Sequence, residues 1–185
     1  MSKHWKHLAV AISFAFACTI PAGLAAGAGD TTRNISDADF ARTAAQGGMA
    51  EVKLGELAEQ NGSSQAVKDF GQRMVNDHRH ADKKLKTAAS EENISLPTEM
   101  SAKDQATYDR LSKLSGPAFD RAFTRDMVKD HEADIAAFRH EANDGKDSTI
   151  KSFASQTLPT LEDHLKLARE TLQTVSPKTS ASLGK

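Results

Sequence analysis

The segment from Val67 to Ala88 constrains the fold more than any other part of the sequence. Its apolar or weakly polar residues recur every three or four positions over about six turns, which is the spacing of one face of an α-helix. A helix with one apolar face has to bury that face against another element. The residues of this stripe are Val67, Phe70, Gly71, Met74, His78, Ala81, Leu85 and Ala88.

Helix start and stop signals bound this segment and the one before it. Ser36 is expected to cap a first helix that ends near Gln60, because Asn and Gly follow at 61–62. Ser63 or Ser64 is expected to cap the second helix. These signals predict two long helices joined by a very short link.

Two further segments show the same helical spacing in the second half of the chain. Pro117 suits the first turn of a third helix, which should end at the Asn-Asp-Gly sequence of 143–145. Asp147 or Ser148 is expected to cap a fourth helix. Pro159 lies inside this fourth pattern, so it should kink or restart the helix.

The links between these segments predict an all-α fold, an antiparallel four-helix bundle. The short links at 61–62 and 144–147 require antiparallel neighbours within each pair of helices. The link between helices two and three is long, and residues 101–114 are expected to form a short extra helix within it. One long connection at this place is typical of ferritin-like bundles, although a plain up-and-down bundle with a decorated loop also fits.

The composition agrees with this class and argues against several functions. Aromatic residues make up only 5% of the chain, which favours helices over strands. The 24 Lys and Arg residues balance 25 Asp and Glu residues without a basic block, so no nucleic-acid partner is expected. The sequence contains no Gly-rich phosphate loop, Cys-His pair or nucleophile elbow, so no catalytic residues are assigned.

The N-terminus has the pattern of a cleaved signal peptide. Lys3 and Lys6 precede an apolar run over 8–20, and small residues around Ala28 match a signal peptidase site. A membrane anchor is the alternative, but the uncharged stretch is short and interrupted by Pro21. We therefore expect cleavage after Ala28 and a periplasmic or secreted protein.

The chain is expected to divide into four parts. Residues 1–28 form the signal peptide, 29–35 a flexible lead, 36–174 the bundle domain and 175–185 a disordered tail. The mature chain would carry no transmembrane segment. Because the only cysteine lies in the signal peptide, the mature chain would also lack disulfides.

A repeated motif points to one candidate site. Residues 70–78 and 123–131 share the pattern F-x-x-x-M-V-x-D-H, and 161–164 repeats its end as Leu-Glu-Asp-His. In helices two and three the histidine falls on the apolar stripe, where a polar residue needs a partner. The three histidines at the ends of these motifs are His78, His131 and His164.

The repeat suggests a metal site in the bundle core. Neutral imidazoles and carboxylates bind divalent transition metal ions, and ligands on facing helices converge in bundle cores. Glu51, in the apolar stripe of helix one, is the expected carboxylate from the remaining helix. The aspartates that precede the histidines could each orient a histidine on the next helix, and these are Asp77, Asp130 and Asp163.

The alternative is that these histidines are hydrogen-bonded core residues that fix the packing and bind nothing. The Glu-x-x-His pair of di-iron bundles is missing, and only Asp77 with His80 comes near it. Ferroxidase chemistry is therefore not expected. His80 and His140 fall on polar faces and are interpreted as surface residues.

Several separated motifs resemble one known group, the bacterial domain-of-unknown-function 4142 family (DUF4142). The resemblance covers about residues 36 to 174 and implies a ferritin-like fold. Members are often labelled predicted outer membrane proteins, and the resemblance implies no established activity. The motifs are residues 44–55 (AAQGGMAEVKLG), the two Met-Val-x-Asp-His steps, residues 111–120 (LSKLSGPAFD), and Thr157-Leu158-Pro159 with His164.

These features together lead to two functional hypotheses. The first is an exported, ferritin-like binding or stress-protective module that holds a metal ion at the four candidate residues. The second is a structural envelope protein that binds a protein partner and has no cofactor.

Overall fold

The computed structural model describes residues 36–176, and all of their regular secondary structure is helical. The prediction of an all-α protein is therefore confirmed. The expected signal peptide, the lead at 29–35 and residues 177–185 of the expected tail lie outside the described residues. The helices are α1 (Asp37–Asn61), α2 (Gln65–Glu91), α3 (Ala102–Leu111), α4 (Gly116–Asp144) and α5 (Ser148–Val175).

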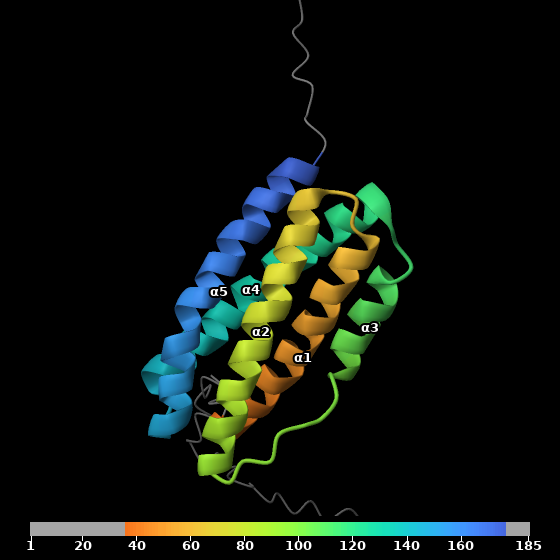
Figure 1. Ribbon diagram of the computed structural model, residues 1–185. Coiled ribbons are helices and arrows are strands. Elements are labelled where there is room, and N and C mark those ends of the chain that lie inside the picture. The colour runs from red at the N-terminus through yellow and green to blue at the C-terminus, as the bar shows by residue number, and fades with distance from the viewer. Residues whose placement is uncertain (1–35, 177–185) are drawn as a thin grey trace, which may run out of the picture. The chain divides into compact units, whose positions relative to one another are not determined.

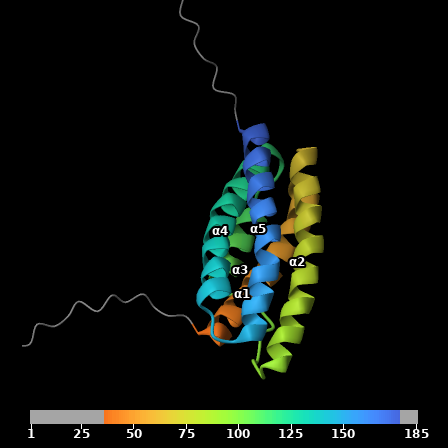
Figure 2. The ribbon, with the colours of Figure 1, turned by 90° about the vertical axis from the view of Figure 1, so that its left-hand side faces the viewer.

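The helices pack as a bundle (Figure 1). The closest pairs are α1 with α2 and α4 with α5, and α2 also packs on α5. Figure 2 shows α4 and α2 on the two sides of α5. The short helix α3 lies beside α1 and also contacts α4. The bundle thus brings helices from both halves of the chain around a common core.

Side chains cap the N-termini of the helices in two different ways. The Ser36 hydroxyl accepts a hydrogen bond from a first-turn amide of α1, and Asp147 does the same for α5. Ser64 is the N-cap residue of α2, as the sequence predicted, but its side chain makes no such bond. Buried Asp120 of α4 accepts the amide hydrogens of Ser63 and Ser64 instead, each at 3.0 Å. A carboxylate from another helix therefore satisfies these amides.

Two glycines allow α1 and α2 to approach closely. A Cβ atom on Gly55 would lie 2.6 Å from the carbonyl oxygen of Gly71. A Cβ atom on Gly71 would lie 2.7 Å from the Cβ of Ala58. Further along the same pair, Gly48 leaves room for the carboxylate of Asp82. Small residues on both helices thus set how closely the backbones of α1 and α2 approach each other.

The apolar core consists of two clusters, and one polar residue of each long helix lies between them. Glu51 separates the clusters on α1, His78 on α2, His131 on α4 and His164 on α5. We call these four residues the polar layer. One cluster contains Phe40, Leu85, Ile135, Phe138, Ile150, Phe153 and Leu161, and the other contains Leu54, Leu57, Val67, Phe70, Met74, Phe119, Phe123, Met127 and Ala168.

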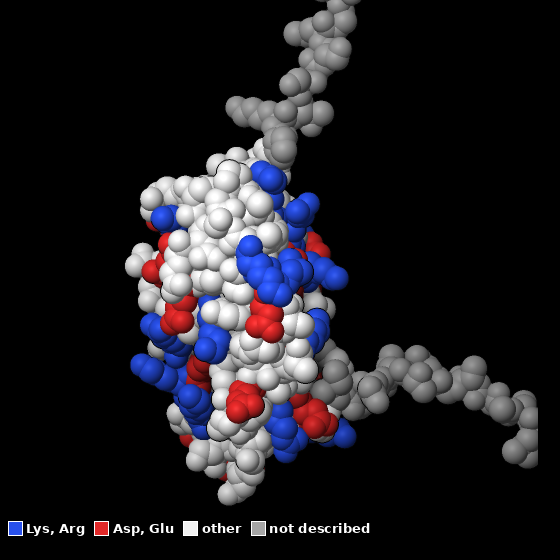
Figure 3. Space-filling view, turned by 90° about the vertical axis from the view of Figure 1, so that its right-hand side faces the viewer, with Lys and Arg blue, Asp and Glu red and all other residues white. Residues whose placement is uncertain are grey.

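The remaining features of the fold concern α5 and the surface. The helix α5 continues through Pro159 as one element, so the expected restart does not occur. No helix within residues 36–176 is both long and apolar enough to cross a membrane. On the face shown in Figure 3, Lys and Arg side chains alternate with Asp and Glu, and neither sign forms a continuous field.

Candidate metal centre

The polar layer is deeply buried. Glu51 is 2% exposed, His78 is 5% exposed, and His131 and His164 are fully buried. Each residue comes from a different long helix, at the point where an apolar stripe would otherwise continue. Buried polar groups need partners, so the arrangement of their nitrogen and oxygen atoms decides what the layer can do.

The three imidazole rings lie next to one another. Their ring centroids are 5.2 Å apart for His78 and His164, 5.4 Å for His131 and His164, and 6.0 Å for His78 and His131. Each ring offers one nitrogen to a group of three that lies within 4.8 Å. The Glu51 carboxylate is 3.0 Å from Nδ1 of His78 and 3.5 Å from Nε2 of His131. The structure thus brings the four sequence-predicted ligands together.

Each histidine has one ring nitrogen fixed by an oxygen acceptor. Nδ1 of His131 donates to the backbone carbonyl of Met127 at 3.0 Å, and Nε2 of His164 donates to Asp77 at 2.8 Å. Nδ1 of His78 donates to Oε2 of Glu51 at 3.0 Å. A carbonyl oxygen and an ionised carboxylate can only accept, so these contacts place the hydrogen on Nδ1 of His131, on Nε2 of His164 and, when Glu51 is ionised, on Nδ1 of His78.

The other nitrogen of each ring therefore carries a lone pair. Nε2 of His131 and Nδ1 of His164 face each other at 3.4 Å without a hydrogen atom to share. Nε2 of His78 and Oε1 of Glu51 are buried and have no hydrogen-bond partner in the described part of the chain. Four electron-rich atoms thus lie in one buried layer, where a cation would satisfy them.

The electrostatics keep the histidines in the form that binds metal. Burial lowers the pKa of His78 and His164, and it lowers the pKa of His131 to about 3. All three rings are therefore neutral near pH 7, as ligation requires. Although burial alone would raise the pKa of Asp77, hydrogen bonds from His164 and Arg73 hold it below the ordinary value. Asp77 is thus an ionised acceptor that orients His164.

The other two predicted orienting aspartates lie elsewhere. Asp163 is exposed and forms no hydrogen bond with a histidine of residues 36–176. Asp130 is half-buried and instead lies with Glu51 and Asp134 in a group of carboxylates within 4.8 Å. Burial and the charge of Asp130 are among the causes that raise the pKa of Glu51 well above its ordinary value.

The sequence patterns did not assign Asp134 to the candidate site. It follows Asp130 by four residues, so both carboxylates lie on one side of α4. That spacing was the available signal, but a pair of aspartates usually indicates a solvated face. Burial, with the charges of Glu51 and Asp130, raises the pKa of Asp134 to about 8.

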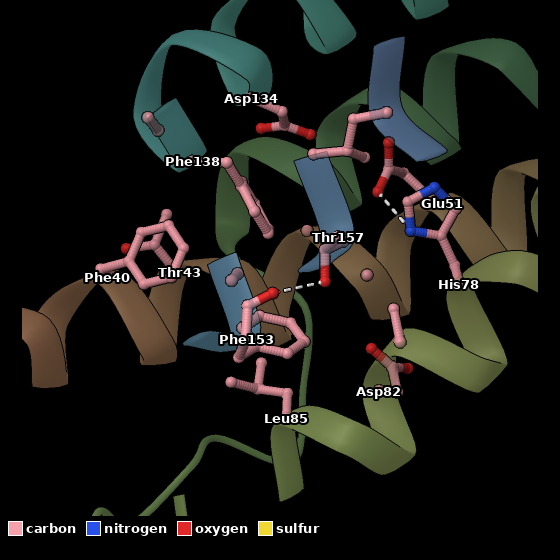
Figure 4. Close-up of a pocket in the computed structure, with 16 residues that line it drawn as sticks. Phe40, Thr43, Glu51, His78, Asp82, Leu85, Asp134, Phe138, Phe153 and Thr157 are labelled. Carbon is pink, nitrogen blue, oxygen red and sulfur yellow. Dashed lines mark hydrogen bonds and ion pairs between the residues drawn. The ribbon is translucent and has the colours of Figure 1, made fainter. Parts of the chain in front are cut away.

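A small cavity adjoins the polar layer (Figure 4). Its volume is about 50 Å³, which is enough for a few water molecules. Glu51, His78, Asp82 and Asp134 line it together with apolar side chains. These include Phe40, Leu85, Phe138 and Phe153.

The raised pKa of Asp134 predicts a pH-dependent stability of the metal-free protein. Folding raises the pKa of this acid, so the contribution of Asp134 to the stability of the folded state falls as the pH rises from about 4 to about 8. Asp134→Asn cannot ionise and should avoid that loss. The variant should be more stable than the wild type by about 2 kcal/mol at pH 9 and similar to it at pH 5.

Urea denaturation in the presence of a chelator at pH 5, 7 and 9 measures this difference. The groups whose charges act on Asp134 are Glu51 of α1, His78 of α2, Asp104 of α3 and Asp130 of its own helix. Asp163→Asn, which changes an exposed residue, should follow the wild type at every pH. A difference between Asp134→Asn and wild type that does not grow with pH would contradict the prediction.

The fold and the polar layer define an all-helical domain with a buried cluster of histidines and carboxylates. The chain belongs to the family described as a domain of unknown function (DUF4142), whose model matches residues 22–171. The resemblance noted in the sequence is thus confirmed. A comparison with curated proteins finds no match.

One solved structure has a similar fold, the crystal structure of a DUF305 fragment from Deinococcus radiodurans. The two chains are 14% identical, with a TM-score of 0.66. The match covers 75% of this chain and 95% of the fragment. At this identity the likeness concerns the fold alone.

Proposed function

We propose that this protein binds a divalent transition metal ion in its polar layer. The ligands are His78, His131, His164 and Glu51. The observation that carries the proposal is the pair of lone-pair nitrogens of His131 and His164, 3.4 Å apart beside the unpaired Oε1 of Glu51. Hydrogen bonds to Met127, Asp77 and Glu51 orient the rings in the manner of ligating histidines.

The donor set limits the kind of ion. Three neutral imidazoles and one carboxylate suit Zn²⁺, Cu²⁺, Ni²⁺ or Fe²⁺ better than Mg²⁺ or Ca²⁺. The ligands come from four helices, so an ion would hold both halves of the chain together. We therefore propose a metal-binding module with a storage, buffering or stress-protective role.

We further propose that the bundle is an antiparallel, ferritin-like four-helix bundle with α3 as an extra helix in its long connection. Along α1 and α5 the chain runs from the Phe40 cluster to the Phe119 cluster, and along α2 and α4 it runs the opposite way. Helices α2 and α4 are then parallel, which supports the long-crossover topology over a plain up-and-down bundle.

The cellular place of the module is part of the proposal. The pattern of residues 1–28 supports export through a cleavable signal peptide, with a periplasmic or secreted mature protein. The protein would then bind its metal ion, and any protein partner of the cell envelope, outside the cytoplasm.

Equilibrium dialysis of untagged, metal-free protein against Zn²⁺ or Co²⁺, followed by metal analysis, tests the proposal. The wild type should bind one histidine-dependent ion per chain. His131→Gln/His164→Gln should weaken that binding by about 100-fold or more, because it removes two ligands. The matched control His80→Gln/His140→Gln changes two exposed histidines and should bind like the wild type.

Two results would reject the metal site. One is a wild type that takes up no ion, and the other is equal binding by the two double variants. The rival function would then stand, a structural or partner-binding envelope protein without a cofactor. In that case His131→Gln/His164→Gln should lower the stability of the protein and change no metal binding. A protein partner that binds an exposed helical face should then be recovered.

A further inference from the structure

A second group of acidic side chains lies beside the histidines. One carboxylate oxygen each of Glu51, Asp130 and Asp134 lies within 4.8 Å of the others. Glu51 comes from α1, whereas both aspartates come from α4 and lie one turn apart. Three ionised carboxylates at this spacing repel one another, so they are neutralised either by protons, in line with the raised pKa values of Glu51 and Asp134, or by a cation.

Within residues 36–176, Lys103 compensates the charge of Asp130 only in part and forms no ion pair with it. Asp130 and Asp134 take part in no side-chain hydrogen bond or ion pair there, although surface carboxylates elsewhere on the bundle pair with arginines. Glu51 gives one oxygen to His78, and its other oxygen, Oε1, is buried, 3.5 Å from Nε2 of His131, and forms no hydrogen bond. A cation bound between this buried oxygen and the two neighbouring carboxylates would satisfy all three groups.

The surroundings leave room for a hydrated ion. Glu51 and Asp134 line the cavity of about 50 Å³ (Figure 4), which can hold a few water molecules. Gly48 carries no side chain at the same cavity, and a Cβ atom there would collide with Asp82. Asp82 is the third carboxylate of the cavity wall, beside those of Glu51 and Asp134.

We infer that Glu51, Asp130 and Asp134 form a second cation site, made of oxygen ligands alone, beside the histidines. Carboxylates and water are the ligands of hard divalent cations, so this site should take Mn²⁺ or Mg²⁺ rather than the ion that three imidazoles select. The inference deepens the proposed function through Glu51, which belongs to both groups, but it does not require an ion at the histidines.

Binding of Mn²⁺ to the metal-free full chain tests the inference, because the electron paramagnetic resonance signal of free Mn²⁺ falls on binding. The wild type should bind one Mn²⁺ ion, and Asp130→Asn/Asp134→Asn should lower the affinity about tenfold or more. Asp134→Asn alone should give a smaller loss of Mn²⁺ affinity. This single variant tests the inference if the double variant does not fold. Asp69→Asn/Asp163→Asn removes two exposed carboxylates and should bind like the wild type.

The histidine variants separate this site from the first one. His131→Gln/His164→Gln should keep the Mn²⁺ affinity of the wild type, and Asp130→Asn/Asp134→Asn should keep the Zn²⁺ uptake at the histidines. Loss of Mn²⁺ in the histidine variant with retention in the aspartate variants would assign the ion to the imidazoles and overturn the inference. A wild type that binds no Mn²⁺, or a control that loses as much as Asp130→Asn/Asp134→Asn, would also overturn it.

Discussion

Adding Zn²⁺ at about 1,000 times its dissociation constant should raise the free energy of unfolding of the metal-free protein by about 4 kcal/mol. The reason is that the ligands come from four helices and are held together only in the folded chain. Urea denaturation of the chelator-treated protein, with and without added Zn²⁺, measures this change as a shift of the midpoint at constant slope.

His131→Leu is the informative comparison for this prediction. It removes a ligand at a position flanked on α4 by Met127 and Ile135 of the two apolar clusters. The variant should lose the response to Zn²⁺, while its metal-free stability should equal or exceed that of the wild type, because leucine suits a buried apolar position. A wild type whose midpoint does not move, or a leucine variant that responds as strongly, would contradict the prediction.

Gly71→Val should lower the free energy of unfolding by about 3 kcal/mol. Its side chain would enter the space between α1 and α2, where even a Cβ atom lies 2.7 Å from the carbonyl oxygen of Gly55. The two atoms that the side chain would meet are the carbonyl oxygen of Gly55 and the Cβ of Ala58. Because neither can rotate away, the overlap can be relieved only if one helix shifts. Thermal and urea denaturation of the variant measure the loss.

Gly47→Ala provides the opposite case within the same helix pair. No atom lies within 4 Å of a Cβ atom at Gly47, so alanine should stabilise α1 by about 0.5 to 1 kcal/mol through its higher helix propensity. If both variants lost stability equally, the effect would come from glycine replacement in general and not from close helix approach.

The helices were predictable because their signals are local. The stripe from Val67 to Ala88 lies within α2, and the first helix, expected to end near Gln60, ends at Asn61. The family was recognisable from motifs that stand in order along the chain. The three histidines were predictable because each ends the same short motif, of which 161–164 repeats only the last part.

The contacts between helices were less predictable. Asp120 satisfies the start of α2 from 56 and 57 residues away, and no local pattern connects it with Ser63 and Ser64. No local pattern distinguishes Asp134 from a surface acid, because its burial depends on how α4 is rotated against α1. Likewise, Asp77 and Asp163 occupy equivalent motif positions, but only Asp77 faces a neighbouring ring.

The polar layer also has a consequence for how the helices align lengthwise. Many apolar side chains in a bundle are interchangeable, so hydrocarbon contacts alone discriminate weakly between neighbouring alignments. A slip of one helix by a single turn, about 5.4 Å, would place an imidazole or the Glu51 carboxylate among phenylalanine rings without a partner. The polar layer therefore favours one lengthwise alignment of the four long helices, whether or not an ion is bound.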